Sequence, residues 1–415
     1  MSSPLSRRSL LKGAAALGGA TLGGPGLIRS AFAQAPRPSA VVMIHFAGGY
    51  NALFTSADPF ITYNHFGVTS SNVTNLGNGL VVDSSGLGSM PAVATSKMAT
   101  LGVYHRLSSH DSAPQAEWTN GSRSYALMLA NALGGTAPIR CAVVGTRFPD
   151  GPHPEENGIS MQMISDTSPI VASLGGSTTD TSVPVRTTGA ALLQSARAMS
   201  ANPLAGSPNS LTTVRTGYDS AIAMLTSPTQ TFDYAALTSA YGVSTSTTSV
   251  SNFATQLMAA ELMLNAGCKV VIAVRSGDWD THGSNPATGE RDRAAFAAIA
   301  PALRTFLGRV MAPTFPIDVT TAIIGDFARS LPSSDHANFT CATVMGPRVK
   351  VGTTGRVTVT RGSALSNPDG GMALYDDRVS INTATPGVTG LWAYLAAAAN
   401  ASTAPFGTNP HALLL

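Results

Sequence analysis

Short apolar runs alternate with segments of helical spacing along this chain, and this alternation constrains the fold more than any other feature. The apolar runs at 40–47, 269–274 and 319–324 predict buried strands. Helical spacing lies before and between the last two runs, at 252–266 and 290–311. Continuous apolar strands separated by helices are typical of an α/β fold with a mainly parallel sheet flanked by helices.

Four further elements are predicted around this unit, namely strands at 101–105 and 140–144 and helices at 114–133 and 390–400. Residues 150–250 differ, because they are rich in Ser, Thr, Gly and Pro and have weak periodicity. We interpret this stretch as a long insertion with some helix that caps the site. The expectation is therefore a single domain over 34–415.

The first 33 residues are typical of an export signal. A twin-arginine pattern, Arg7-Arg8 within 6–12, precedes a mild apolar stretch and the small-residue run Ala31-Phe32-Ala33. We expect the twin-arginine export machinery to carry the chain and cleavage to follow Ala33, which gives a periplasmic or secreted protein. A membrane anchor is the alternative, but 13–27 is only about fifteen residues where roughly 20 are needed, so we expect no membrane span after cleavage.

Charge and cysteine content exclude two classes of protein. Removing the four basic residues of 1–33 from the 25 Lys and Arg leaves 21 against 22 Asp and Glu, and no basic run remains. Nucleic acid is therefore not an expected partner. Cys141, Cys268 and Cys341 are odd in number and have apolar neighbours, which predicts free buried thiols instead of a disulfide framework.

Polar clusters follow the predicted strands, at 48–51, 105–112, 278–282 and 325–336. Because ligands of parallel α/β sheets bind beyond the carboxyl ends of the strands, these four clusters are the candidate site.

The cluster after 269–274 contains three potential metal ligands, Asp278, Asp280 and His282. If the strand continues, their alternation places them on one face. Carboxylate and imidazole donors suit one zinc, manganese or similar divalent cation. Taken alone, the pattern is more typical of a turn cap and a surface histidine than of a metal site. Asp335-His336, after the next strand, makes a shared metal pocket the favoured interpretation.

The cluster at 105–112 leads into a predicted helix. Ser109 at this position is typical of a helix cap. A helix N-terminus also holds anions, so the same serine is a candidate nucleophile.

These motifs together resemble the DUF1501 family, exported bacterial proteins related to the alkaline phosphatase and sulfatase superfamily. The resemblance covers about 40–400 and rests on Gly48-Gly49-Tyr50-Asn51, Ser109-His110, Trp279-Asp280-Thr281-His282, and 325–330 followed by Asp335-His336. It implies an alkaline-phosphatase-like fold with a metal and anion site at the carboxyl edge of the sheet. Asp280, His282, Asp335 and His336 match the family's metal-site motifs, Ser109 its serine, and Arg329 its anion-clamping arginine.

The chain departs from the family pattern at three acidic positions. Asn51 stands where the family has an aspartate that would be a metal ligand, and an amide is a poorer ligand than a carboxylate. Asp326 is shorter than the family's glutamate, and Asp278 is an extra carboxylate that could compensate for Asn51.

Two functions follow as expectations. The first is an exported, metal-dependent hydrolase of phosphate or sulfate esters that acts on a small anionic ester. Ser109 would be the nucleophile and Arg329 would hold the anionic group. The alternative is a non-catalytic exported binding or assembly protein with a degenerate site, which Asn51 favours.

Overall fold

The computed structural model describes residues 37–415 except 51, 56, 64, 138, 146–155, 176–185, 200–214, 216–217, 220–221, 223–232, 278, 283–285, 329–335, 338, 355–357, 360–371 and 374–386. Pro38–Leu415 forms one compact unit. Within the part of the chain that the structure describes, no helix has the length and apolarity needed to cross a membrane.

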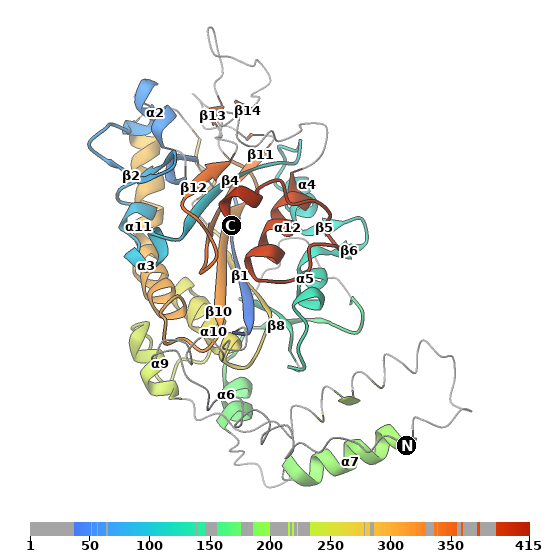
Figure 1. Ribbon diagram of the computed structural model, residues 1–415. Coiled ribbons are helices and arrows are strands. Elements are labelled where there is room, and N and C mark those ends of the chain that lie inside the picture. The colour runs from blue at the N-terminus through green and yellow to red at the C-terminus, as the bar shows by residue number, and fades with distance from the viewer. Residues whose placement is uncertain are drawn as a thin grey trace, which may run out of the picture. The chain divides into compact units, whose positions relative to one another are not determined.

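An eight-stranded sheet is the centre of this unit (Figure 1). The order of its strands is β12 (Gly352–Thr354), β4 (Met98–Tyr104), β11 (Phe339–Met345), β10 (Asp318–Gly325), β1 (Ser39–Phe46), β9 (Val270–Arg275), β7 (Cys141–Val144) and β8 (Met161–Ile164). β1 lies between β10 and β9 and is parallel to both, and β7 and β8 continue in the same direction. β11 alone among these eight strands runs antiparallel to its neighbours. The predicted α/β fold with a mainly parallel sheet is confirmed.

Helices cover both faces of the sheet (Figure 1). On one face, Val42, Ile44 and Phe46 of β1 pack with α3 (Ala92–Thr95), α10 (Phe253–Asn265) and α11 (Pro286–Val310). On the other face, Val41 and Met43 pack with α4 (Ser112–Trp118), α5 (Tyr125–Leu133) and α12 (Val388–Ala398). Because successive side chains of a strand point to opposite faces, a strand buried on both sides must be apolar throughout. This explains the uninterrupted apolar run that predicted β1.

The predicted helix over 114–133 is wrong as one element. α4 ends at Trp118, and a short hairpin of β5 (Thr119–Asn120) and β6 (Arg123–Ser124) separates it from α5. Gly121, at a φ of 62°, begins the turn of this hairpin. Glycine reaches this conformation without steric cost, so Asn120-Gly121 ends the helix although the apolar spacing continues.

The stretch 150–250 contributes to the main sheet as well as to its surroundings. Its strand β8 pairs with β7 at the edge of the sheet. The described helices of the stretch are α6 (Ser168–Gly175), α7 (Arg186–Met199) and α9 (Tyr234–Ala240). Thr167 and Tyr234 join two of these parts through a hydrogen bond of 3.0 Å between their hydroxyl groups. That the stretch is an insertion that caps the site stays a prediction.

The remaining elements are short. They are α2 (Asp58–Tyr63), the 3₁₀ helices η1 (Ala52–Phe54), η2 (His65–Gly67), η3 (Leu87–Ser89) and η4 (Ala412–Leu414), and the strands β2 (Val73–Gly77), β3 (Leu80–Asp83), β13 (Thr358–Val359) and β14 (Met372–Ala373). All three cysteines are buried and free, as predicted.

Candidate metal centre

Four polar segments meet at one edge of the sheet. The carboxyl ends of β1, β4, β9 and β10 lie at this edge and lead into loops that contain Gly48, His110, Asp280 and Asp326, respectively. β11 runs in the opposite direction, so it begins at this edge, and His336 lies just before its first residue. Segments far apart in the sequence are therefore neighbours here.

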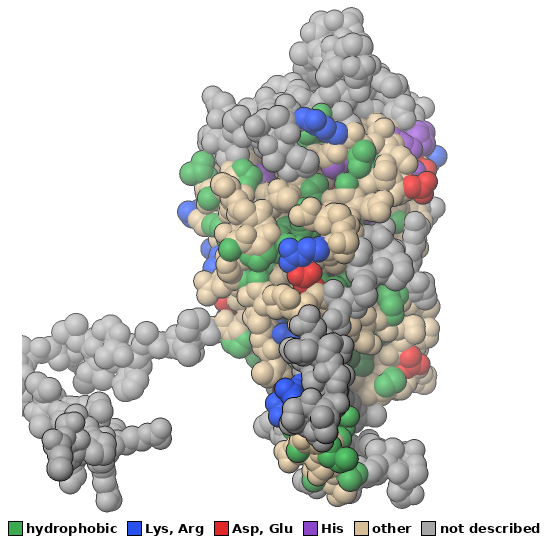
Figure 2. Space-filling view, turned by 90° about the vertical axis from the view of Figure 1, so that its right-hand side faces the viewer, with side chains coloured by type: hydrophobic (Ala, Val, Ile, Leu, Met, Phe, Trp, Pro, Cys, Tyr) green, Lys and Arg blue, Asp and Glu red, His purple; other side chains and the backbone are tan. Residues whose placement is uncertain are grey.

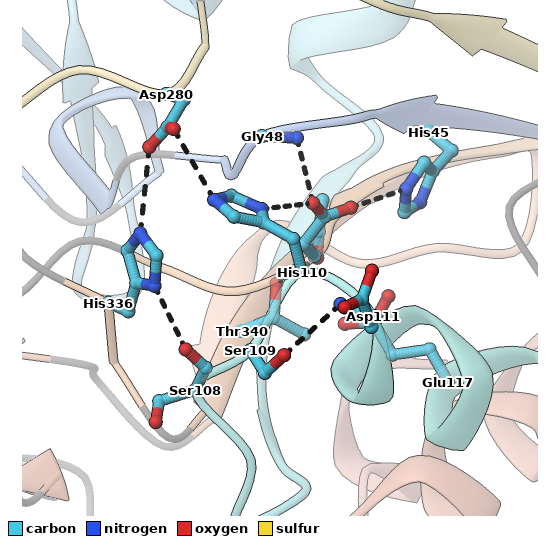
Figure 3. A network of polar contacts seen from close by, with 12 residues as sticks. His45, Gly48, Ser108, Ser109, His110, Asp111, Glu117, Asp280, His336 and Thr340 are labelled. Carbon is cyan, nitrogen blue, oxygen red and sulfur yellow. Dashed lines mark hydrogen bonds and ion pairs between the residues drawn. The ribbon is translucent and has the colours of Figure 1, made fainter.

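His110, Asp280 and His336 form a group that could hold a metal ion, since one ligand atom from each lies within 4.8 Å of the other two (Figure 3). His110 Nε2 lies 3.4 Å from Asp280 Oδ2, and His336 Nε2 lies 3.6 Å from Asp280 Oδ1. Two ligands bound about 2.1 Å from a tetrahedral ion are about 3.4 Å apart. Both separations are close to this value, although the two histidines approach different oxygens of the Asp280 carboxylate.

The other ring nitrogen of each histidine is held by an acceptor. His110 Nδ1 donates to Asp326 Oδ2 at 2.7 Å, and His336 Nδ1 donates to the carbonyl oxygen of Ser108 at 2.9 Å. A carbonyl or an ionised carboxylate can only accept, so each Nδ1 carries the hydrogen. The lone pair of each Nε2 then faces Asp280. Histidines that bind metals in proteins are oriented in this way.

Asp326 fixes this arrangement from behind. Its Oδ1 accepts from His45 Nε2 at 2.8 Å, and its Oδ2 accepts from the Gly48 amide at 2.9 Å as well as from His110. Burial by itself would raise the pKa of Asp326, but the hydrogen bonds from His45, His110 and Gly48 and the charge of His45 outweigh it and lower the pKa to about 2. Asp326 is therefore ionised and acts as an acceptor across the neutral pH range.

Close packing positions Asp280. A Cβ at Gly48 would lie 2.9 Å from the Asp280 amide nitrogen, so only glycine lets the loop after β1 pass this backbone. Trp279 stacks on Phe46, with ring centroids 4.1 Å apart and planes 5° apart. Both aromatic rings are buried, which anchors the backbone just before Asp280.

The group is open on its outer side. The Asp280 side chain is 50% exposed, against 26% for His336 and 34% for His110. Phe327 is fully buried beneath the two imidazoles, with ring centroids 4.7 Å from His110 and 4.4 Å from His336. In Figure 2, histidine and acidic side chains gather at the upper right of the surface. Solvent reaches the group mainly through the Asp280 carboxylate, because Nε2 of His110 and Nε2 of His336 are both buried.

Two buried groups on α4 and the end of β4 do not form an ion pair, although His105 Nε2 lies 3.8 Å from Glu117 Oε1. Burial, with the negative charge of Asp326, raises the pKa of Glu117 well above its usual range. Burial lowers the pKa of His105 to about 4. Both side chains therefore favour their uncharged forms.

The structure brings together only some of the residues predicted for the site. Asp280 and His336 are in the group, whereas His282 lies beside it with Nε2 3.1 Å from Asp280 Oδ1. Ser109 is exposed, and its Oγ accepts from the Asp111 amide at 3.3 Å. Figure 3 shows this contact on the side of the loop away from Asp280. The remaining candidates, Asn51, Asp278, Arg329 and Asp335, lie outside the described residues.

The proposed continuation of the strand through 278–282 is wrong. β9 ends at Arg275, and Asp280 and His282 lie in the following loop. The two side chains are in contact, while Thr281 between them is buried and donates to Asp292 at 2.6 Å. The alternation in the sequence therefore comes from a loop in which Trp279 and Thr281 are buried and Asp280 and His282 are exposed.

Sequence reasoning missed three functional residues of the centre, His110, His45 and Asp326. His110 and Asp326 belong to the polar clusters predicted for the site, at 105–112 and 325–336, but neither was predicted to be a ligand or to orient one. His45 itself could have indicated a buried polar contact at β1, because an imidazole in an otherwise apolar strand needs a buried partner.

Fold and site define this chain as an α/β protein with a candidate metal centre at the carboxyl edge of a mostly parallel sheet. Comparison with protein-family models, with curated proteins and with solved structures finds no match.

Proposed function

We propose that this protein is an exported metal-dependent hydrolase of phosphate or sulfate esters with an alkaline-phosphatase-like fold, as its resemblance to the DUF1501 family implies. The observation that carries the proposal is the group of His110, Asp280 and His336, with Asp326 orienting the first of these histidines. Two imidazoles and a carboxylate suit zinc or manganese, and one ion is the expected content.

A bound divalent ion would stabilise negative charge on the transferring group and lower the pKa of a bound water to about 7. His110 and His336 would hold that ion through their Nε2 atoms. Asp280 would supply the negative ligand and leave an outer face open to a small anionic ester. Arg329, between Asp326 and His336 in the sequence, is the proposed clamp on the anionic group.

Ser109 is the proposed nucleophile, next in the sequence to His110 and exposed to solvent. The test uses purified mature protein with zinc or manganese, 4-nitrophenyl phosphate and 4-nitrophenyl sulfate. Ser109→Ala is expected to abolish turnover and to keep the bound metal. Ser402→Ala is a matched control, because Ser402 is also exposed and also accepts from an amide two residues on at 3.3 Å.

The outcomes distinguish a serine nucleophile, a metal-bound water as nucleophile, and a protein that is not a hydrolase of these esters. Turnover lost only in Ser109→Ala supports the serine nucleophile. Turnover kept in Ser109→Ala but lost in His336→Ala assigns the attack to a metal-bound water and removes the role of Ser109. A wild type that binds metal but hydrolyses neither ester contradicts the hydrolase.

The second candidate is a non-catalytic exported binding or assembly protein, favoured by Asn51 in place of a ligating aspartate. If Asn51 has disabled the centre, Asn51→Asp should raise the metal affinity and restore turnover, because it supplies a charged oxygen. A wild type that is inactive and unchanged by Asn51→Asp supports the binding role.

Export by the twin-arginine machinery, to the periplasm or the outside, belongs to the same proposal. Replacing Arg7 and Arg8 with lysine should leave the precursor in the cytoplasm. Cell fractionation and immunoblotting measure the export. Normal export of that variant would contradict the twin-arginine route.

A further inference from the structure

A cavity of about 520 Å³ lies between α9, the beginning of α10 and the middle of α11. Its size is typical of pockets for small organic ligands. None of the described candidate metal ligands, His110, Asp280, His282 and His336, is among its described lining residues. The twelve lining residues are Ala240, Tyr241, Gly242, Asn252, Phe253, Ala254, Arg275, Ala298, Ile299, Pro301, Ala302 and Thr305.

The walls of this cavity are mostly apolar. Ile299 and Ala302 are on the same side of α11, at a spacing of three residues, and Phe253 faces them from the first turn of α10. Such walls favour the apolar body of a ligand over water.

Arg275 is the one charged residue among the twelve. It is the last residue of β9 and lies on the face that Val271 and Ala273 turn toward α10 and α11. Its Nε is buried and has no hydrogen-bond partner among the residues that the structure describes. A buried charged donor without an acceptor is unfavourable, so the site calls for an acceptor from a ligand.

The beginning of α10 adds positive potential to the same cavity. Asn252 caps the helix by accepting from the Thr255 amide at 3.0 Å, and the first-turn residues Phe253 and Ala254 line the cavity. The amide groups of a first helical turn carry partial positive charge. No acidic side chain is among the lining residues to offset Arg275.

We propose that this cavity binds an organic anion, a carboxylate with an apolar body of the size of a medium-chain fatty acid. The carboxylate pairs with Arg275, and the chain lies along Ile299 and Ala302. The site is distinct from the candidate metal centre. Phe253 packs on Phe46 with ring centroids 6.5 Å apart, and Phe46 stacks on Trp279, so buried aromatic rings lie between the cavity and Asp280.

Isothermal titration calorimetry on the mature protein tests the proposal with three probes that share one chain length. Decanoate is expected to bind with one site per protein. Decanol, which lacks the charge, and decyltrimethylammonium, which reverses it, are expected to bind at least about tenfold more weakly. Equal binding of all three, or none of decanoate, overturns the proposal.

Variants locate the site. Arg275→Met keeps the length of the side chain and is expected to weaken decanoate binding at least about tenfold, whereas Arg304→Met on the exposed side of α11 is expected to leave it unchanged. Ala302→Trp fills the cavity and should weaken decanoate binding even if Arg275→Met fails to fold. Unchanged affinity in Ala302→Trp or in a folded Arg275→Met contradicts the site.

The His336→Ala variant distinguishes this cavity from the metal centre. Decanoate should bind to it as to the wild type, because His336 does not line the cavity. Loss of decanoate binding in His336→Ala would place the carboxylate on the metal and overturn the inference.

Discussion

Asp326 is the residue on which the orientation of the candidate metal ligands depends most. It accepts hydrogen bonds from two histidines and one backbone amide, and its low pKa keeps it ionised. Its hydrogen bond fixes the hydrogen of His110 on Nδ1, which leaves Nε2 to bind an ion. Asp326, which lies outside the three-ligand group, thus orients one of its members.

Asp326→Asn should lower the affinity for zinc by about 10- to 100-fold, with the fold retained. The amide has one acceptor oxygen for three donors, so His110 loses its fixed orientation. Competition with a chromophoric chelator measures the affinity. Asp318→Asn is the matched control, because Asp318 is the first residue of the same strand, β10, at the opposite end. Equal affinities in wild type and Asp326→Asn would show that Asp326 is only structural.

Some of the candidate metal ligands could be predicted from the sequence and others could not. Asp280 and His336 follow apolar strands, so the rule on carboxyl ends predicted that they could meet. His110 is separated from its strand by five residues, and neither its direction nor its partner Asp326 follows from spacing. The direction of His110 and its contact with Asp326 depend on how the loops pack, for example on the close approach of backbones at Gly48. Such packing cannot be predicted from one sequence.

At the scale of elements, the apolar runs predicted β1, β9 and β10 to within a few residues. Helical spacing predicted α10, α11 and α12 to within a few residues, but not the break between α4 and α5. Neither β11 nor its direction was predicted, and a short apolar strand carries no mark of its orientation. That direction matters for the site. A parallel β11 would begin at the other edge of the sheet and carry His336 away from Asp280.

The C-terminal segment is held against the sheet by a buried histidine, His411. His411 hydrogen-bonds to Thr354 of β12 at 2.7 Å and packs edge-on against Tyr394 of α12, with ring centroids 6.1 Å apart. Burial lowers the pKa of His411 from 6.5 to about 4. The imidazole is therefore neutral in the folded protein at a pH at which the unfolded chain binds a proton.

This shift predicts loss of stability in acid. Above pH 6.5 the contribution of His411 to the free energy of unfolding is fully present. It is lost as the pH falls to about 4, which lowers the free energy of unfolding by on the order of 3 kcal/mol. The lowered pKa of His105 also causes loss of stability in acid, so the effect of His411 is isolated by comparing the wild type with His411→Asn. The stability of that variant should fall less steeply over this pH range. Urea denaturation at a series of pH values measures the slopes. Parallel curves for the two proteins would contradict the assignment.

For the whole molecule, the candidate metal centre joins parts of the chain that are distant in sequence. His110 follows β4, Asp280 follows β9 and His336 precedes β11, so a bound ion would connect three segments of one sheet edge. Unfolding separates these ligands. An ion held by these ligands would therefore bind the folded state far more tightly than the unfolded chain, and its binding energy would add to the stability of the fold.

The thermal stability of the protein should consequently depend on the metal. Zinc at a thousand times its dissociation constant would stabilise the fold by about 4 kcal/mol, which in a chain of this size raises Tm by roughly 5 °C. Differential scanning calorimetry of the mature protein with zinc and with a chelator measures the difference. His336→Ala should remove most of it, while His282→Ala, whose side chain lies outside the three-ligand group, should keep it. A Tm that is the same with zinc and with chelator would show that the three side chains do not bind the ion.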